Sequence, residues 1–265
     1  MSVNLPAKPR ERIICALDTS DLSKCRRWVR ALRGWIRWFK VGSELFSAAG
    51  TKAIHCVREE GGEVFLDLKF HDIPHTVERA SEQAAKLGVG MFNVHASGGL
   101  DMMRAARRSV ARGKQSPWIL AVTVLTSMKA QTLRGELGIR RPLRKQVLHL
   151  AGLAEQAGLD GVVASAEEVR LIKQRLGRAF RVVTPGIRPL WASPDDQNRL
   201  VTPRGAFEAG ADFIRREGAA EMNVPMLDLA AEYREIGSEL SAAMQTALLL
   251  SRLRQIGIDF LREFK

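Results

Sequence analysis

Short apolar runs alternate with amphipathic segments along most of this sequence. The runs are rich in Val, Ile, Leu and Phe, which is typical of parallel strands buried on both faces. They cover 12–18, 38–42, the first part of 63–76, 91–97, 118–125, 161–165 and 181–184, and an eighth begins at 211–214. The segments between them predict helices over 20–34, 44–60, 77–87, 100–112, about 142–157 and 166–176, and a short one from 202. Residues 128–144 are polar and irregular in pattern, and 188–201, which have no hydrophobic period, are expected to form a long loop.

This strand–helix alternation predicts a single (β/α)8 barrel. In such a barrel the carboxyl ends of all strands meet at one face, where barrels of this kind build their sites. Almost every run ends in a polar residue: Asp18, Lys40, Asp67, Lys69, His95, Ser97, Thr126, Ser165 and Thr184. We therefore expect a functional site at this face.

The stretch 63–76 contains the densest group of charges among these strand ends. Asp67 and Lys69 are two residues apart on a strand, so their side chains should point the same way, into the barrel. Asp72 follows just past the strand, before Ile73-Pro74, which holds the backbone extended. A lysine between two carboxylates fits either a catalytic group or a structural ion pair beside a helix cap. The position at the carboxyl end of a strand modestly favours catalysis.

Composition limits the class of protein further. The length of 265 residues and the 46% hydrophobic content suit one large domain with a substantial core. The formal charge of +12 comes from scattered basic residues not interleaved with aromatics, so we expect no nucleic-acid partner, whereas an anionic small molecule is compatible. The sequence has no run of about 18 apolar residues, so we expect no membrane span. Residues 1–12 lack the apolar core of a secretory signal, so the cytoplasm is the expected location.

The apolar runs and their flanking residues resemble one enzyme family. The segments RIICALD, WFKVGSELF, FLDLKFHDIPHTV, FNVHASGG, VTVLTS, GVVAS and VVTPGIR occur in the order found in bacterial orotidine 5′-monophosphate decarboxylases, and the resemblance covers roughly residues 10–214. The signature Asp-x-Lys-x-x-Asp is its most specific part. The resemblance implies a homodimeric (β/α)8 barrel, a lyase that converts orotidine monophosphate to uridine monophosphate in pyrimidine biosynthesis with no metal and no organic cofactor.

The resemblance also implies roles for the charged residues. Lys69 would donate a proton to the ring carbon that loses carbon dioxide, and Asp67 would lie beside it near the departing carboxylate. Asp18 and Lys40 would hold the ribose hydroxyls and join the charge network. These residue types suit the reaction, because decarboxylation leaves electron density on a ring carbon, which a fixed ammonium stabilises and then protonates.

The remaining implied positions reach a second subunit or close over the ligand. Asp72, with Ile73 and Thr76, would extend into the neighbouring subunit's site. The others are Thr126, at the base or ribose, and Pro185, Arg188 and Gln197, in the loop that closes over base and phosphate.

The C-terminal part departs from the family. After Ala211–Ile214 the family has an apolar stretch and a Gly-Arg pair that binds the substrate phosphate, whereas this chain continues Arg215-Arg216-Glu217-Gly218. Charges inside a strand need partners, so barrel closure, phosphate affinity and full activity are all in question. Arg215 or Arg216 replacing the lost phosphate ligand is the weaker hypothesis.

The chain is therefore divided into a decarboxylase barrel, residues 1–218, and an atypical tail, residues 219–265. Apolar residues at helical spacing over 226–263 predict one or two helices in that tail. Residues 223–237 resemble the opening segment of pyridoxal-phosphate sugar aminotransferases, but nothing else of that family is present, so no such activity or cofactor is expected.

Three alternatives remain open from the sequence. The first is a magnesium-dependent 3-keto-gulonate phosphate decarboxylase of the same barrel group. The second is an inactive barrel that dimerises or binds nucleotide without turnover, favoured by the altered eighth strand. A metal at His71 and His75 is a weaker idea, because His-x3-His in a loop is a poor ligand set by itself.

Overall fold

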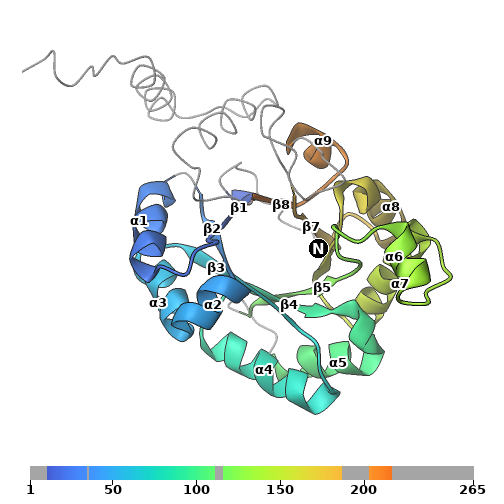
Figure 1. Ribbon diagram of the computed structural model, residues 1–265, viewed down its shortest axis with the longest axis horizontal. Helices are drawn as coiled ribbons and strands as arrows, with labels where there is room; N and C mark the ends of the chain where they lie inside the picture. The colour runs from blue at the N-terminus through green and yellow to red at the C-terminus, as the bar shows by residue number, and fades with distance from the viewer. Residues whose placement is uncertain (1–10, 35, 111–115, 187–202, 217–265) are drawn as a thin grey trace, which may run out of the picture.

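The computed structural model describes residues 11–34, 36–110, 116–186 and 203–216. Within these ranges eight parallel strands form a closed barrel in sequence order, with helices around it (Figure 1). The strands are β1 Ile13–Ala16, β2 Trp38–Gly42, β3 Glu63–Phe70, β4 Met91–His95, β5 Trp118–Val122, β6 Gly161–Val163, β7 Arg181–Thr184 and β8 Phe213–Arg216. The predicted (β/α)8 barrel is confirmed.

The helices lie at the predicted positions with three exceptions: a short helix, α6, lies within 128–144, where none was predicted, and the elements near Gly50 and Pro74 differ from the prediction. They are α1 Leu22–Leu32, α2 Ser43–Ala49, α3 Thr51–Glu59, α4 Pro74–Lys86, α5 Gly99–Ser109, α6 Ala130–Gly135, α7 Leu143–Gln156, α8 Ala166–Leu176 and α9 Pro203–Glu208, with a 3-10 turn at Ala96–Gly98. The single helix expected over 44–60 is two, because Gly50 has a φ of +57°, outside the helical region. The helix after β3 begins at Pro74, earlier than expected, since proline fits the first helical position, where no N–H is needed.

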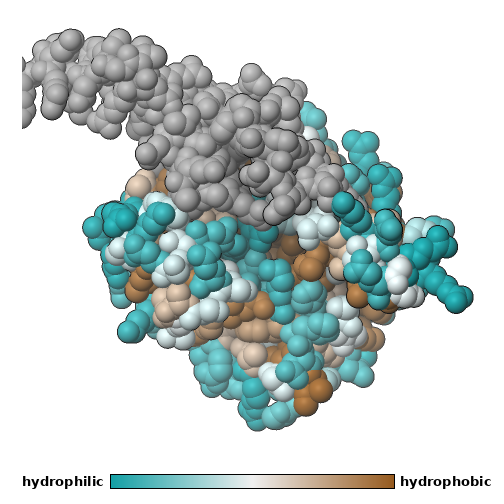
Figure 2. Space-filling view, viewed as in Figure 1, coloured by the Kyte–Doolittle hydropathy of each residue, from teal (hydrophilic) through white to brown (hydrophobic). Residues whose placement is uncertain are grey.

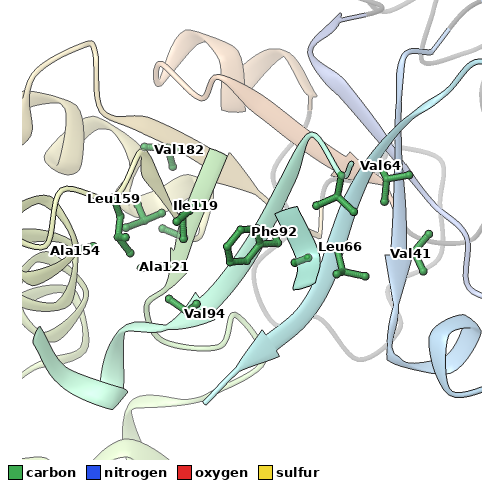
Figure 3. Close-up of a cluster of buried hydrophobic side chains, with 14 of the residues drawn as sticks. Val41, Val64, Leu66, Phe92, Val94, Ile119, Ala121, Ala154, Leu159 and Val182 are labelled. Carbon is green, nitrogen blue, oxygen red and sulfur yellow. The ribbon is translucent and has the colours of Figure 1, made fainter. Parts of the chain in front are cut away.

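Side chains alternate between two cores along each strand. The outer core lies between the strands and the helices, and Figure 3 shows Val64 and Leu66 of β3 with Phe92 and Val94 of β4 in it. The inner core fills the barrel with Ile14, Trp38, Phe65, Met91, Leu120, Val183 and Phe213. Most of these inner residues are at the starts of their strands. The apolar plug therefore occupies the amino-terminal end and leaves the carboxyl-terminal end for polar side chains.

An aromatic cluster forms much of this plug. The ring of Trp38 stacks on that of Trp118 with 5.6 Å between centroids, and the ring of Phe213 contacts both, at 6.0 and 5.6 Å. Tilted and edge-on pairs of this kind are favoured by the charge distribution of the rings. Because Phe213 opens β8, this cluster fixes the eighth strand to β2 and β5 from inside.

The eighth strand closes the barrel in regular register. Ile13 of β1 pairs with Ile214, and Val183 of β7 pairs with Phe213. The doubt about closure, which rested on the charge of Arg215 and its neighbours, is therefore wrong. The physical reason is that the Arg215 guanidinium has a buried carboxylate partner across the barrel, Asp67. Residue 217 and the whole predicted tail, 219–265, lie outside the described residues.

The outer surface of the described helices is largely hydrophilic. Figure 2 shows hydrophilic residues spread around the rim, with small apolar patches between them. Within the described ranges, no helix has the length and apolar content needed to cross a membrane.

A buried carboxylate joins the first and third helices. Glu60, which is 5% exposed, accepts hydrogen bonds from Arg26 and Arg30 of α1 at 2.8–3.1 Å, and the Arg33 guanidinium lies 3.7 Å away. The hydrogen bonds from Arg30, and then those from Arg26, outweigh burial and lower the pKa of Glu60 from 4.5 to about 2. The cluster therefore stabilises the fold through charge-assisted hydrogen bonds.

Replacing Glu60 with glutamine is expected to flatten the acid dependence of stability. A carboxylate whose pKa is lowered by folding stabilises the native state above its unfolded pKa, 4.5, and loses that effect as the pH falls toward about 2. The variant should be less stable than the native chain at pH 7 and should lose less stability between pH 4.5 and 2. Urea unfolding across this range measures both, with exposed Glu44→Gln as control; parallel curves for all three chains would contradict the account.

Candidate active site

The alternation of side chains along β3 and β4 places two polar residues, Asp67 and Asn93, inside the barrel. In β3 the inner-core residue Phe65 is followed two positions later by Asp67, and in β4 Met91 is followed by Asn93. Asp67 and Asn93 are 2% and 1% exposed, respectively. These side chains therefore lie just above the apolar plug, at the carboxyl-terminal end of the barrel.

Asp67 is the centre of this polar group. Its Oδ1 lies 2.8 Å from the Lys69 ammonium and accepts a 2.6 Å hydrogen bond from the Asn93 amide. Its Oδ2 accepts a 2.6 Å hydrogen bond from Nη1 of Arg215. Burial alone would raise the pKa of Asp67, but the charges of Arg215 and Lys69 and the hydrogen bonds outweigh it, so the pKa is below its ordinary value. Asp67 is thus a fixed anion between two cations.

Asn93 is a functional candidate that the sequence analysis missed. Besides donating to Asp67, its side-chain oxygen accepts a 2.8 Å hydrogen bond from the backbone N–H of Lys69. The signal was present in the sequence, since Asn93 is the one amide in the apolar run Met91–Val94 and shares the inward face with Met91. Asn93 therefore positions both the carboxylate and the lysine backbone.

The backbone at Lys69 is in an unusual conformation. Its φ is +52°, the only positive value at a non-glycine residue in the described ranges, and the β3–β4 register shifts between Leu66 and Phe70. A left-handed conformation costs a residue with a Cβ about 1–2 kcal/mol. The bulge and the bond to Asn93 hold the lysine in this geometry, and such strain is frequent where a side chain must be aimed.

This geometry predicts a stability difference between two truncations of the lysine. Lys69→Gly should be more stable than Lys69→Ala by about 1 kcal/mol, because both lose the ammonium and only glycine adopts a positive φ without strain. Urea unfolding of the two variants measures the difference. The same pair of replacements at exposed Arg79, in the interior of α4, is the control and should favour alanine by a similar amount. Equal signs at the two positions would show that Lys69 is not strained.

A second ion pair lies on the neighbouring strands. The Lys40 ammonium, nearly buried, lies 2.6 Å from Oδ1 of Asp18, whose side chain is 37% exposed. Gly42 makes room for it, because a Cβ there would lie 3.1 Å from Nζ of Lys40. The structure therefore brings Asp18 and Lys40 together as one pair and Asp67 and Lys69 as another.

A pocket opens above Asp67 and Lys69. Its lining includes Thr126 and Pro185, two of the residues predicted from the sequence, and Arg215. The remaining walls are apolar: Phe65, Val122, Val124, Leu125, Val163 and Val183. Apolar walls with a few charged groups are typical of small-molecule binding sites.

Other predicted residues are not part of this pocket. Asp72, Ile73 and Thr76 are exposed, and the Asp72 carboxylate accepts a 2.7 Å hydrogen bond from the backbone N–H of Ile73. The described contacts of Lys69 thus include one of the two expected carboxylates, Asp67. Arg188 and Gln197 lie outside the described residues.

Two histidines flank the lysine on the side of β4. The rings of His71 and His95 are 5.2 Å apart. Burial first, and then the electrostatic effects of the neighbouring His71 and Lys69, lower the pKa of His95, which therefore favours its neutral form. A group of three or more His, Cys, Asp or Glu side chains able to hold a metal is absent from the part of the chain that the structure describes.

Fold and site together define a (β/α)8-barrel protein with a lysine–carboxylate group at the mouth of the barrel. A sequence profile described as "Orotidine 5'-phosphate decarboxylase / HUMPS family" matches residues 11–215. The chain belongs to this family.

Individual relatives agree with this assignment. The orotidine 5'-phosphate decarboxylase of Syntrophotalea carbinolica is 50% identical over 210 residues, which cover 77% of this chain and 86% of the relative. That of Pelobacter propionicus is 49% identical over 207 residues with the same coverage. The crystal structure of orotidine 5'-phosphate decarboxylase from Lactobacillus acidophilus superposes with a TM-score of 0.73 and 35% identity, over 86% of this chain and 100% of that one.

Proposed function

We propose that this chain is a carboxy-lyase that converts orotidine 5′-monophosphate to uridine 5′-monophosphate in pyrimidine biosynthesis. The observation that carries the proposal is the Lys69 ammonium, held 2.8 Å from buried Asp67 on the floor of a pocket with apolar walls. Membership of the family supports the same reaction, as do the relatives of about 50% identity that are orotidine 5'-phosphate decarboxylases. A soluble biosynthetic enzyme of this kind belongs in the cytoplasm.

The chemistry follows from the position of the ammonium. As the carbon–carbon bond to the carboxylate breaks, its electron pair stays on the ring carbon and carbon dioxide leaves. Nζ of Lys69 stabilises this pair and donates a proton to it, which leaves uridine monophosphate and a neutral amine. The Lys69 side chain is 33% exposed, so water can return the proton to the amine.

Asp67 and Asn93 would act on the reaction through Lys69. The Asp67 carboxylate pairs with the ammonium and fixes its position, and Asn93 holds the lysine backbone in its bulged conformation. Asp67 would also lie near the substrate carboxylate. Because its buried charge is already paired with two cations, it can remain ionised as an anionic substrate arrives.

The remaining substrate contacts are assigned by the resemblance. Lys40 and Asp18 would bind the ribose hydroxyls, and their 2.6 Å pair presents one donor and one acceptor group for that purpose. Thr126 would contact the base or ribose, and Pro185 would belong to the loop that closes over base and phosphate; both residues line the pocket. Arg188 and Gln197, which lie outside the described residues, would belong to the same closing loop.

A second subunit would complete the site. Ile73 is 66% exposed, an unusual position for a large apolar side chain, and it stands beside exposed Asp72 and Thr76 at the start of α4. We expect these three residues to enter the partner's pocket in a homodimer. Mixing inactive Lys69→Ala with inactive Asp72→Ala should then restore activity, because one of the two sites in each mixed dimer is intact. No recovery from mixtures shown to exchange subunits would refute the shared site.

A chelator distinguishes this proposal from the magnesium-dependent alternative. Conversion of orotidine monophosphate that is equally fast with and without EDTA would support the proposed reaction. Activity that appears only on a keto-sugar phosphate and only with magnesium would replace it. Tight nucleotide binding with no product from either substrate would favour the inactive barrel.

A further inference from the structure

Arg215 is a charged residue inside the barrel where the sequence resemblance leads one to expect an apolar one. It lies in β8 two positions after Phe213, which belongs to the inner core, while Ile214 between them belongs to the outer core. Alternation therefore points Arg215 inward, and its side chain is only 13% exposed. The arginine is thus built into the site.

The contacts of Arg215 place it at the reacting end of the pocket. Its Nη1 bonds at 2.6 Å to the Oδ2 of Asp67, while Lys69 lies 2.8 Å from the Oδ1 of the same carboxylate. Arg215 also lines the pocket beside Lys69. The guanidinium and the ammonium therefore share one carboxylate, which puts Arg215 where Lys69 acts and argues against the hypothesis that Arg215 replaces the lost phosphate ligand.

The arginine changes the charge that an incoming group meets. Among the described residues, the charged members of the pocket lining are Asp67, Lys69 and Arg215, which together carry one net positive charge. With a neutral residue at 215 the same lining would be neutral overall. A net positive floor favours a ligand carboxylate, and a guanidinium binds carboxylates through a planar fork of N–H donors.

We propose that Arg215 binds the carboxylate of the substrate and so determines preference for the carboxylated nucleotide over its decarboxylated product; this inference rests on the proposed function. Arg215 would stabilise the bound substrate more than the transition state, because the carboxylate loses its negative charge as carbon dioxide forms. Interactions that favour the ground state lower KM without raising kcat. The chain would therefore bind its substrate tightly through Arg215 and release its product readily.

The test compares two variants that separate the charge of Arg215 from its planar fork. Arg215→Gln removes the charge but keeps a hydrogen-bond donor for Asp67, and Arg215→Lys keeps the charge but loses the fork. In Arg215→Gln we expect KM for orotidine monophosphate to rise about 10- to 100-fold, the loss typical of a charge-assisted hydrogen bond. Its kcat should not fall, and Kd for uridine monophosphate, measured by calorimetry, should change by less than about threefold. Arg215→Lys should raise KM by a smaller factor.

Several outcomes would overturn the inference. Equal losses of affinity for substrate and product would mean that Arg215 supports the fold or the phosphate. An unchanged KM in both variants would mean that it does not meet the carboxylate. If Arg215→Gln does not fold, Arg215→Lys decides alone. A larger loss of affinity for orotidine monophosphate than for uridine monophosphate would support the inference, and equal losses would contradict it. Exposed Arg79→Gln in α4 is the control. A native chain that binds neither nucleotide would instead refute the proposed function.

Discussion

Replacing Lys69 with alanine is expected to reduce the rate of decarboxylation by at least about 10⁴-fold. General acid catalysis contributes about 10²–10⁴-fold, and stabilisation of developing charge by one fixed group a further 10²–10³-fold. Lys69 supplies both, since its ammonium is aimed into the pocket by a bulge, by Asn93 and by Asp67. Single-turnover measurement of product formation isolates this effect from binding and release.

Two comparisons decide whether the loss belongs to the chemistry. Lys86→Ala, which removes an exposed ammonium from α4, should leave the rate unchanged. The Kd of Lys69→Ala for uridine monophosphate should rise far less than its rate falls, because the apolar walls and the Asp18–Lys40 pair are retained. If the rate of Lys69→Ala is within tenfold of the native rate, Lys69 is not the proton donor.

Replacing Asp67 with alanine is expected to lower the free energy of unfolding by about 3–5 kcal/mol at pH 7. The cost is this large because the change leaves Lys69 and Arg215 facing each other without their shared counter-ion, and buried charges that lose a partner destabilise strongly. Urea unfolding measures the difference. Activity should fall as well, since the lysine would lose the carboxylate that holds it.

The effect of Asp67 should also depend on pH in a defined direction. Its pKa is lowered by folding, so its stabilising effect is present above its ordinary pKa of 3.8 and is lost as the pH falls below that value. The stability gap between native chain and variant should therefore narrow in acid. Asp160→Ala, which breaks the Arg107 ion pair away from the pocket, is the control: it should lower stability without lowering kcat. A gap under about 1 kcal/mol at pH 7 would show that the two cations do not depend on Asp67.

The sequence was sufficient to predict the barrel because short buried strands and amphipathic helices leave separate patterns. The run WFKVG at 38–42 and the run RVVT at 181–184 are strands with the predicted bounds. The same alternation predicted that Asp67 and Lys69 share the inward face, and both line the pocket. The local sequence pattern was therefore sufficient to predict the barrel and the pairing of Asp67 with Lys69.

What could not be predicted depends on contacts between distant residues. The bond between Arg215 and Asp67 joins positions 148 residues apart, and only the closed barrel brings them together. The left-handed backbone at Lys69 depends on the register shift against β4 and on the hydrogen bond to Asn93. Neither can be predicted from the residues next to Lys69 in the sequence. The break at Gly50 was missed for a different reason, since a glycine inside a helical pattern is often tolerated.

The central claim is that this chain, with its own C-terminal sequence, releases carbon dioxide from orotidine 5′-monophosphate. The most direct test supplies the purified 265-residue protein with substrate labelled in the carboxyl carbon and follows labelled carbon dioxide and uridine monophosphate together. The account predicts that both form in equal amounts over many turnovers, and that neither forms with Lys69→Ala. A folded native chain that binds the nucleotide and releases neither product would contradict it.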